Sequence, residues 1–307
     1  MTKVFIDGSA GTTGLRIVDR LQQRKDLELL ILPEEMRKDP SARADALNSA
    51  DIAFLCLPDD AAKESAALAA GMSVKIIDTS TAHRTDPDWV FGMPELTGLR
   101  KKITASSRIA NPGCHASGFI ALVAPLVQKG IITPHTALSC FSLTGYSGGG
   151  KKMIAEYEDP NRNPLLGAPR QYALTQAHKH LKEMVKISRL ETAPVFCPIV
   201  ADFYSGMEVT VSLFASQCKG NLEDIKDLYR SYYTGGLVHF DENPDGDGLL
   251  SAAAYSGRDD MGVSVFGNEE RILLTARFDN LGKGASGAAI QNMNILLGLD
   301  QATGLNV

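Results

Sequence analysis

The sequence lacks the patterns that mark disulfide frameworks, metal sites and membrane spans. Its five cysteines include no CxxC pair and its six histidines no HExxH motif, so we predict reduced thiols and no metal. No apolar run approaches the roughly 18 residues of a spanning helix, and no signal peptide precedes the strand-like sequence at Lys3. A net charge of −5 without any Lys/Arg run argues against nucleic acid as a partner. We therefore expect a cytoplasmic protein with no membrane partner.

The order of the apolar segments predicts an α/β protein with two domains of different types. The chain has 307 residues, 44% of them apolar, which is ample for two cores. Before Cys114, short strand-like runs alternate with helical stretches, which predicts a parallel, doubly wound (Rossmann) sheet. Longer strand candidates and Gly/Pro loops follow, which predicts an α+β domain with a mostly antiparallel sheet. The expected strands are 3–7, 27–32, 52–57, 74–78, 137–143, 207–215 and 271–278. The expected helices are 15–21, 60–70, one that begins close to 114 and includes 119–127, 172–187, 221–233 and a last one ending near 299.

A glycine-rich turn joins the first expected strand to the first expected helix. It reads Gly8-Ser9-Ala10-Gly11-Thr12-Thr13-Gly14, with the spacing GxxGxxG instead of the GxGxxG of dinucleotide-binding proteins. Glycines let the backbone approach a pyrophosphate, whose charge the N-terminus of the helix stabilises. The alternative is an ordinary tight turn. The position between a strand and a helix favours nucleotide binding.

A single cysteine lies where a second buried helix is expected to begin. In Asn111-Pro112-Gly113-Cys114-His115, the proline and glycine end a strand, and an apolar run of helical spacing follows. The free N–H groups and partial positive charge of a helix N-terminus favour thiolate over thiol. Cys114 is therefore the candidate covalent nucleophile, whereas Cys56, Cys140, Cys197 and Cys218 are interpreted as small apolar residues.

Two further loops follow expected parallel strands, at the edge where such sheets bind ligands. One is Cys56-Leu57-Pro58, and the other contains Ser80 and continues to His83 and Arg84. His83 or Arg84 would suit an anionic substrate, and a solvated surface pair is the equally good alternative.

A second glycine-rich segment, also in a loop, runs from Gly145 to Lys152. The N–H groups of consecutive glycines form an anion nest, so the hydroxyl of Ser147 and the backbone of Gly148 and Gly149 are candidates to bind phosphate; a flexible surface loop is the alternative. The same segment spells GxSxG, the nucleophile elbow of serine hydrolases. That different function would use Ser147, an acid that is Asp202 or a later one, and His239, but it leaves the first glycine turn and the Cys114 segment unexplained.

The candidate general base is one of two histidines, His178 and His180. Both fall within the helix expected over 172–187, where residues two apart point about 200° apart. On that basis we predict that at most one of them faces the site. The sequence does not decide which.

These motifs together resemble the N-acetyl-γ-glutamyl-phosphate reductases of arginine biosynthesis, in their shorter type 2 form. The resemblance spans essentially the whole chain and rests on the Gly8–Gly14 turn, the segments Asp78–Arg84 and Asn111–Cys114, the two histidines, and Asp279–Gly284. One departure is Lys182, where such enzymes often carry proline. Aspartate-semialdehyde dehydrogenases share the Asn-Pro-Gly-Cys element and are the nearest alternative in chemistry. A nucleotide-binding protein with an unreactive Cys114 is a third.

The resemblance implies reduction of an acyl phosphate to an aldehyde. The Cys114 thiolate displaces phosphate to give a thioester, hydride from the nicotinamide reduces it, and His178 or His180 handles the proton. Residues 1–113 and 283–307 are then the nucleotide-binding domain and residues 114–282 the catalytic and dimerisation domain of a homo-oligomer, a dimer or tetramer. Arg84, Ser147, Gly148 and Gly149 would bind the small-molecule substrate or its phosphate. The expected cofactor-binding residues are Gly8, Ser9, Ala10, Gly11, Thr12, Thr13, Gly14, Cys56, Leu57, Pro58, Ser80 and Asn280.

The choice between the two nicotinamide cofactors is left open by the spacing alone. About twenty residues beyond the glycine turn, Glu34 would suit the ribose of NAD, while Arg37 or Lys38 would suit the 2′-phosphate of NADP. The family resemblance favours NADP(H).

Overall fold

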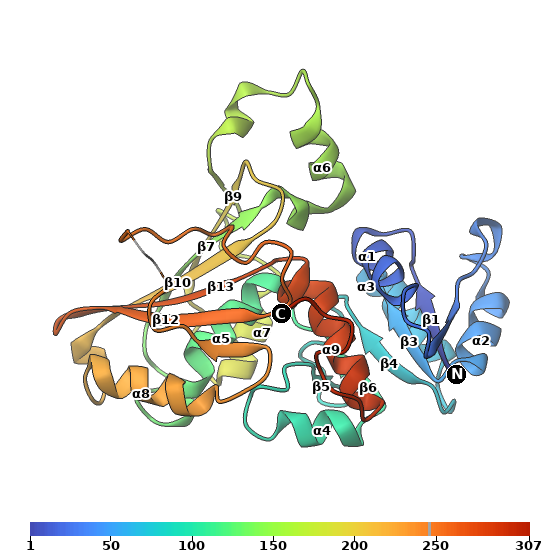
Figure 1. The fold of residues 1–307 in the computed structure, drawn as a ribbon, viewed down its shortest axis with the longest axis horizontal. Coiled ribbons are helices and arrows are strands. Elements are labelled where there is room, and N and C mark those ends of the chain that lie inside the picture. Colours follow the sequence, from blue (N-terminus) through green and yellow to red (C-terminus); the bar gives the residue numbers. More distant parts are fainter. Residues whose placement is uncertain (245–246) are drawn as a thin grey trace. The chain divides into compact units, whose positions relative to one another are not determined.

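The structure, a computed structural model, describes residues 1–244 and 247–307, and these form two compact units (Figure 1). The first unit comprises Met1–Pro112 and Ala285–Leu305. The second unit comprises Gly113–Gly284 and Asn306–Val307. Each unit has its own sheet. The chain passes into the second unit at Gly113, returns to the first at Ala285, and ends with two residues that belong to the second unit.

The first unit is built on a six-stranded parallel sheet with strand order β2-β1-β3-β4-β6-β5. Its strands are apolar on both faces, as a sheet covered on both sides requires. The parallel sheet predicted from the alternating segments is therefore confirmed. The strands are β1 (Thr2–Asp7), β2 (Leu27–Leu30), β3 (Ile52–Leu55), β4 (Lys75–Asp78), β5 (Val90–Phe91) and β6 (Arg108–Ala110).

Helices cover both faces of this sheet. Alternate residues of β1 and β3 supply two separate apolar clusters, since Val4, Ile6 and Phe54 pack with α1 and α9, while Phe5 and Leu55 pack with α2 and α3. This two-sided burial is the doubly wound arrangement that the sequence predicts. The helices are α1 (Thr12–Leu21), α2 (Pro40–Ser49), α3 (Asp59–Leu68), α4 (Leu99–Ala105) and α9 (Gly287–Leu296), with a short 3₁₀ helix, η1 (Glu34–Met36).

The second unit is built on a seven-stranded mixed sheet with strand order β11-β12-β13-β10-β7-β9-β8. Four of its six pairings are antiparallel and two are parallel, so the mostly antiparallel sheet predicted for this part is confirmed. The strands are β7 (Ser139–Gly145), β8 (Arg170–Gln171), β9 (Val195–Ala201), β10 (Met207–Phe214), β11 (Val238–Phe240), β12 (Met261–Gly267) and β13 (Arg271–Phe278).

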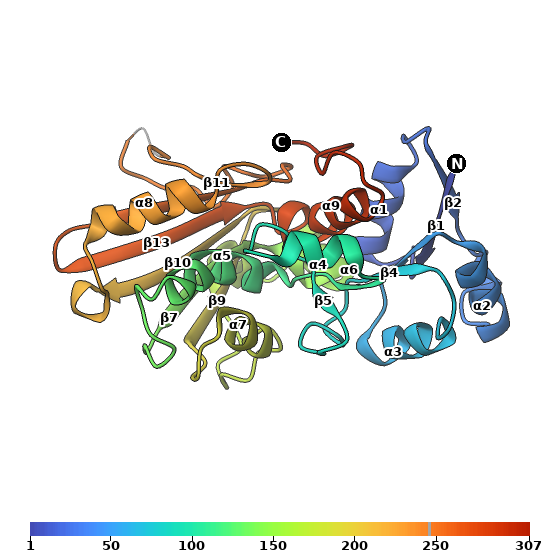
Figure 2. The ribbon, with the colours of Figure 1, turned by 90° about the horizontal axis from the view of Figure 1, so that it is seen from below.

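Helix α5 is the centre of this unit. It lies against β10 and β13, with α7 and α8 beside it (Figure 2). Phe119, Ile120 and Leu122 are completely buried, and each contributes about 1.5–3 kcal/mol through burial. The helices are α5 (Cys114–Gln128), α6 (Gly150–Glu158), α7 (Leu181–Ser188) and α8 (Leu222–Tyr232), with the 3₁₀ helices η2 (Tyr146–Gly149), η3 (Pro164–Gly167) and η4 (Ala215–Gln217) and the π-helix η5 (Gly282–Ser286).

Two kinds of feature are missing from the residues that the structure describes. No helix within residues 1–244 and 247–307 combines the length and the apolar character needed to cross a membrane. In the same residues, no three His, Cys, Asp or Glu side chains gather as a metal site requires.

Candidate active site

Cys114 is the first residue of α5, as the sequence predicts. Gly113 precedes it in extended conformation (φ −79°, ψ 147°) and no side chain caps the helix there. Cys114 is partly exposed, whereas residues 115 to 126 of the helix are all buried. The thiol therefore lies at the N-terminal end of a largely buried helix, where the helix dipole stabilises negative charge.

The backbone of the π-helix packs directly against Cys114. A Cβ atom on Gly284 would lie only 3.0 Å from the Cβ of Cys114, so glycine is needed at this approach. The turn before it is held by Asp279, which is fully buried and whose Oδ1 accepts hydrogen bonds from Leu281 N (2.7 Å) and Gly282 N (3.1 Å). π-helical turns often occur at functional sites.

The segment that carries the two histidines is not the helix we predicted. The expected helix was 172–187, but α7 spans only Leu181–Ser188. Ala173 and Gln176 have positive φ angles (52° and 57°), which no helix allows. The Gln176 amide replaces helical bonds by pairing both ways with the backbone of Phe196 on β9, at 2.8 Å each.

The prediction that at most one histidine faces the site is therefore wrong. The rings of His178 and His180 lie 4.7 Å apart between centroids, and each lies 5.6 Å from the ring of His115, the residue after Cys114. The 200° argument fails because neither residue is inside a helix: His178 is in the loop and His180 precedes the first residue of α7. Both histidines contact one cluster.

The two histidines differ in their surroundings. Burial, and then the charge of Lys179, lower the pKa of His178 to about 4, and its Nδ1 accepts a hydrogen bond from the backbone N of His180 (3.2 Å). His180 is buried, with its Nε2 4.0 Å from Oε1 of Glu183. The other oxygen of this buried carboxylate accepts from Gly113 N (3.1 Å), so Glu183 links His180 to the start of α5.

His115 itself was not considered from the sequence. It is buried, with Nδ1 2.6 Å from Ser142 Oγ and Nε2 2.7 Å from the hydroxyl of Tyr172. Burial, followed by the charges of His178 and Lys179, lowers the pKa of His115 to about 3, so the ring is neutral near pH 7. A signal existed, because His115 is the only ionisable residue between Cys114 and Gln128. The sequence gave no such signal for Tyr172, because the strand before it, β8, has only two residues and is too short to show a pattern.

The Gly145–Lys152 loop is ordered as η2 and the first turn of α6. The N–H groups of Tyr146 and Ser147 donate to the carbonyls of Phe203 (2.9 Å) and Tyr204 (3.0 Å), and Gly148 and Gly149 belong to the 3₁₀ turn of η2. Ser147 is buried, and its Oγ accepts a hydrogen bond from Asn280 Nδ2 (3.0 Å).

The serine hydrolase alternative is wrong. Asp202 forms an ion pair with Arg162, and His239 contacts Tyr255 and Asp260. His239 lies on β11, four strands away from β7, which leads to Ser147; at about 4.8 Å per strand this is roughly 19 Å. The three residues cannot act together.

In the first unit, the glycine turn brings backbone atoms into close approach at both of its ends. Gly8 has a φ of +86°, and a Cβ on Gly8 or Gly14 would lie 2.3 Å from a backbone oxygen, of Cys56 and Gly8 respectively. Gly11 precedes the first residue of α1, and no side chain caps this helix. The Cys56 segment closes the turn, because its N–H donates to Asp7 O (2.8 Å). Burial raises the pKa of Cys56 to about 12, so this cysteine is an unreactive thiol.

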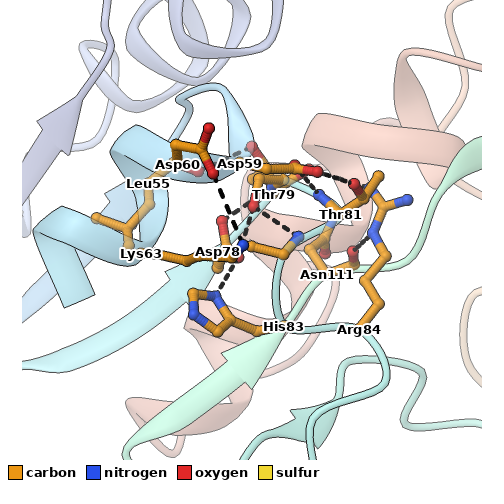
Figure 3. Close-up of polar contacts among 12 residues, drawn as sticks. Leu55, Asp59, Asp60, Lys63, Asp78, Thr79, Thr81, His83, Arg84 and Asn111 are labelled. Carbon is orange, nitrogen blue, oxygen red and sulfur yellow. Dashed lines mark hydrogen bonds and ion pairs between the residues drawn. The ribbon is translucent and has the colours of Figure 1, made fainter. Parts of the chain in front are cut away.

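The loop after β4 is held by buried polar contacts (Figure 3). Asp78 accepts from Ser80 Oγ (2.8 Å) and contacts His83 Nδ1 (2.7 Å), while His83 stacks on Trp89. Arg84 donates to the carbonyls of Asn111 (2.9 Å) and Thr79 (3.0 Å). His83 and Arg84 are both buried, so the solvated surface pair is wrong. Contacts of Ser80 and Arg84 with ligands stay predictions.

Comparison with known families assigns both parts of the chain. Residues 3–105 match the semialdehyde dehydrogenase NAD binding domain, and residues 114–280 match the semialdehyde dehydrogenase dimerisation domain. The chain therefore belongs to the semialdehyde dehydrogenase family of oxidoreductases, and its first part is a nicotinamide-nucleotide-binding domain.

Curated relatives narrow this to one branch of the family. N-acetyl-gamma-glutamyl-phosphate reductase of Brucella suis is 45% identical over 96% of this chain and 99% of that protein. N-acetyl-gamma-glutamyl-phosphate reductase 2 of a Nostoc species is 44% identical over 99% of both chains. The resemblance found in the sequence motifs is thus confirmed.

Solved structures give the same fold at lower identity. Aspartate semialdehyde dehydrogenase II of Vibrio cholerae, complexed with ASA, has a TM-score of 0.73 at 19% identity and covers 97% of this chain and 98% of its own. Aspartate semialdehyde dehydrogenase of Candida albicans, with NADP, has a TM-score of 0.67 at 16% identity, over 97% and 99%. These similarities confirm the predicted fold class.

Proposed function

We propose that this protein reduces N-acetyl-γ-glutamyl phosphate to N-acetylglutamate semialdehyde and phosphate with NADPH, in arginine biosynthesis. The observation that carries the chemistry is the placement of Cys114 at the uncapped start of α5, in the same unit as a cluster of histidines. The relatives named above carry the choice of substrate. Fold similarity to aspartate semialdehyde dehydrogenases at 16–19% identity gives no independent support for their substrate.

The Gly8–Gly14 turn is the proposed cradle for the pyrophosphate of the cofactor. A Cβ on Gly11 would meet nothing closer than 3.5 Å, so its glycine leaves open space at the N-terminus of α1, where backbone N–H groups bind anions. Thr12, Thr13 and the segment Cys56-Leu57-Pro58 border the same turn. When bound, the nicotinamide supplies the hydride that reduces the acyl group.

Cys114 is the proposed nucleophile. Its thiolate forms a bond to the acyl carbon, and phosphate leaves with the electron pair of the C–O bond, which gives a thioester. The uncapped first turn of α5 stabilises the thiolate before attack. Gly284 leaves room for the cysteine, because a Cβ at this position would come within 3.0 Å of the Cβ of Cys114.

His180 is the proposed general acid and base, and His178 a neutral hydrogen-bond donor. The carboxylate of Glu183 beside His180 would stabilise an imidazolium there, as the third member of a catalytic triad does. His178 is a weaker base, because its pKa is lowered to about 4, and its Nδ1 already accepts from the backbone. His180 takes up the thiol proton as the Cys114 thiolate forms, and it returns this proton to the sulfur when the aldehyde is released.

Phosphate is proposed to bind at the η2 loop. Asn280 donates to Ser147 Oγ, so the hydroxyl proton of Ser147 remains available as a donor, and the backbone of Gly148 and Gly149 in η2 is proposed to contact the same anion. Lys151 and Lys152 add positive charge at the start of α6.

The cofactor is proposed to be NADP(H). The segment after β2 carries exposed Glu34 in η1 together with Arg37, whose Nε donates to Leu32 O (3.3 Å). The remaining guanidinium donors of Arg37 would suit a 2′-phosphate. A higher kcat/KM with NADH than with NADPH would overturn this choice.

A second copy of the chain is proposed to cover the open face of the seven-stranded sheet. Phe141, Val195 and Leu273 lie on the same face of β7, β9 and β13 by register, and each is more than 40% exposed. Exposed apolar residues of this kind mark an interface. Sedimentation of Phe141→Lys beside the wild type tests the idea: we expect a shift towards monomer.

The experiment that tests the function is an assay in the reverse direction. NADP⁺ reduction is followed with N-acetylglutamate semialdehyde and phosphate, and in parallel with aspartate semialdehyde and phosphate. We expect activity with the first pair. Activity with the second pair alone would refute the proposed substrate.

A further inference from the structure

Three polar side chains form a hydrogen-bonded row next to Cys114. Ser142 lies on β7 and is completely buried, with its Oγ 2.6 Å from Nδ1 of His115. On the other side of the ring, Nε2 of His115 is 2.7 Å from the hydroxyl of Tyr172. The row therefore runs from Ser142, in the interior of the sheet, through His115, the residue that adjoins the cysteine, to Tyr172.

The ring of His115 carries a single N–H. Because burial lowers its pKa to about 3, the ring is neutral near pH 7, and one nitrogen donates while the other accepts. Two arrangements of protons are possible: either Ser142 donates to Nδ1 and Nε2–H donates to Tyr172, or Nδ1–H donates to Ser142 and Tyr172 donates to Nε2.

The partners of Ser142 decide between the two arrangements. Among the described residues, the only side-chain contact of its hydroxyl is with His115. If Nδ1–H donated to Ser142, the buried serine proton would have no acceptor, at a cost of about 1–3 kcal/mol. In the first arrangement every proton of Ser142 and His115 has an acceptor. The hydroxyl proton of Tyr172 then points away from His115.

Tyr172 is held rigidly enough to aim that proton. Its backbone N–H donates to Pro198 O (3.0 Å), which extends the pairing of β8 with β9, and its oxygen accepts from His115. Burial, and then the charge of the Cys114 thiolate, raise the pKa of Tyr172 well above its ordinary value. The phenol therefore keeps its proton at neutral pH, within electrostatic range of the sulfur.

We propose that Tyr172 is a further catalytic residue, which donates a hydrogen bond to the acyl oxygen of the substrate as Cys114 attacks. The inference rests on the proposed function. As the sulfur–carbon bond forms, the π electrons of the carbonyl move onto this oxygen, and they return when phosphate leaves. Tyr172 keeps its proton throughout. His115 and Ser142 are positioning residues, since they act only through the direction of the Tyr172 hydroxyl.

Tyr172→Phe tests the donor directly, since it removes one oxygen atom. We expect kcat to fall about 100-fold with KM for NADP⁺ unchanged, the size of effect seen when one oxyanion donor is lost. The matched control is Tyr157→Phe, because Tyr157 is a buried tyrosine of the same unit whose hydroxyl has no hydrogen-bond partner among the described residues. Equal kcat values for Tyr172→Phe and the wild type would overturn the inference.

The order of protons is tested without substrate, by ¹⁵N NMR of the histidine side chains at neutral pH. Comparison with His115→Gln identifies the His115 signals. We expect a protonated Nε2 and an unprotonated Nδ1 in the wild type. In Ser142→Ala, which removes the donor to Nδ1, we expect the other tautomer to become populated and kcat to fall. A protonated Nδ1 in the wild type would overturn the assignment. If the wild type proved inactive on N-acetylglutamate semialdehyde, the proposed function would fail while this tautomer measurement still stood.

Discussion

The two glycine-rich segments of the chain look alike in sequence, but glycine does different things at the two ends of the first segment and at Gly148 of the second. In the Gly8–Gly14 turn, a Cβ at either end would lie 2.3 Å from a backbone oxygen, so the fold of the turn itself requires glycine. At Gly148 a Cβ would meet only the side chains of Asn280 and Thr144, at the ordinary distances of 3.5 and 3.6 Å. A glycine pattern therefore has no single meaning. In the first segment it shapes the backbone, and at Gly148 it leaves space beside a buried serine.

The same contrast separates the two units. In the first unit we assign function to backbone shape, at the start of α1. In the second unit we assign it to side chains, which are Cys114, the histidines and Tyr172. Substitutions should therefore separate nucleotide binding from the chemical step, and the following predictions run from the largest effect to the smallest.

Cys114→Ala should abolish turnover and leave nucleotide binding intact. Loss of a covalent nucleophile lowers kcat by about 10⁴-fold or more. The helix should persist, because alanine is a better helix former than cysteine. Steady-state kinetics measure the loss of turnover, and a nucleotide titration on the same preparation measures whether binding is retained. A variant that kept more than a trace of activity would exclude the thioester.

Gly11→Val should weaken nucleotide binding on the order of 100-fold, since the branched side chain keeps the backbone from the pyrophosphate. A Cβ at position 11 would make only ordinary van der Waals contacts, at 3.5 Å or more, so the turn should still fold. Alkylation of Cys114 should proceed at the wild-type rate. The control is Gly167→Val, where nothing lies within 4 Å of a Cβ. Unchanged cofactor affinity in Gly11→Val would remove the turn from the binding site.

His180→Asn should lower kcat about 100-fold, the usual contribution of a general acid–base residue. His178→Asn should have a clearly smaller effect, because His178 is assigned only a hydrogen bond. The pH profile separates the two, since loss of the base also removes one limb of the kcat profile. Equal losses, with both profiles retained, would contradict the assignment of roles within the pair.

Gly148→Pro should raise KM for phosphate about tenfold in the reverse direction and leave KM for NADP⁺ nearly unchanged. A tenfold change corresponds to about 1.4 kcal/mol, which is the contribution of one hydrogen bond. Proline deletes the N–H group. Gly148→Ala keeps it in a site with room for a methyl group and should behave like the wild type. If both Michaelis constants rose together in Gly148→Pro, the loop would be merely structural.

Local signals in the sequence predicted most of the fold. Glycine and proline before Cys114 set the start of α5, and runs of strand-forming apolar residues gave β10 and β13 almost to the residue. The 172–187 segment failed because its apolar spacing is helical but its conformation is fixed from outside, by the bonds between Gln176 and β9. Such long-range bonds leave no periodic trace in the chain.

The candidate site was predictable where residues adjoin a motif and hidden where the fold brings them together. Cys114 and the pair His178 and His180 were found from the sequence alone. The row from Ser142 to Tyr172 joins residues 27 and 57 positions away from His115, and no spacing rule connects them. Glu183 lies three positions after His180, a spacing that could have drawn attention to it.

The central claim is that Cys114 is acylated by the substrate, and intact-protein mass spectrometry tests it most directly. The protein is mixed with N-acetyl-γ-glutamyl phosphate in the absence of any nicotinamide cofactor, quenched in acid and digested for peptide mapping. The account predicts one N-acetylglutamyl group per chain, on the peptide that contains Cys114, sensitive to hydroxylamine and absent from Cys114→Ala. An adduct on another residue, or no adduct in a preparation that turns over with NADPH, would contradict it.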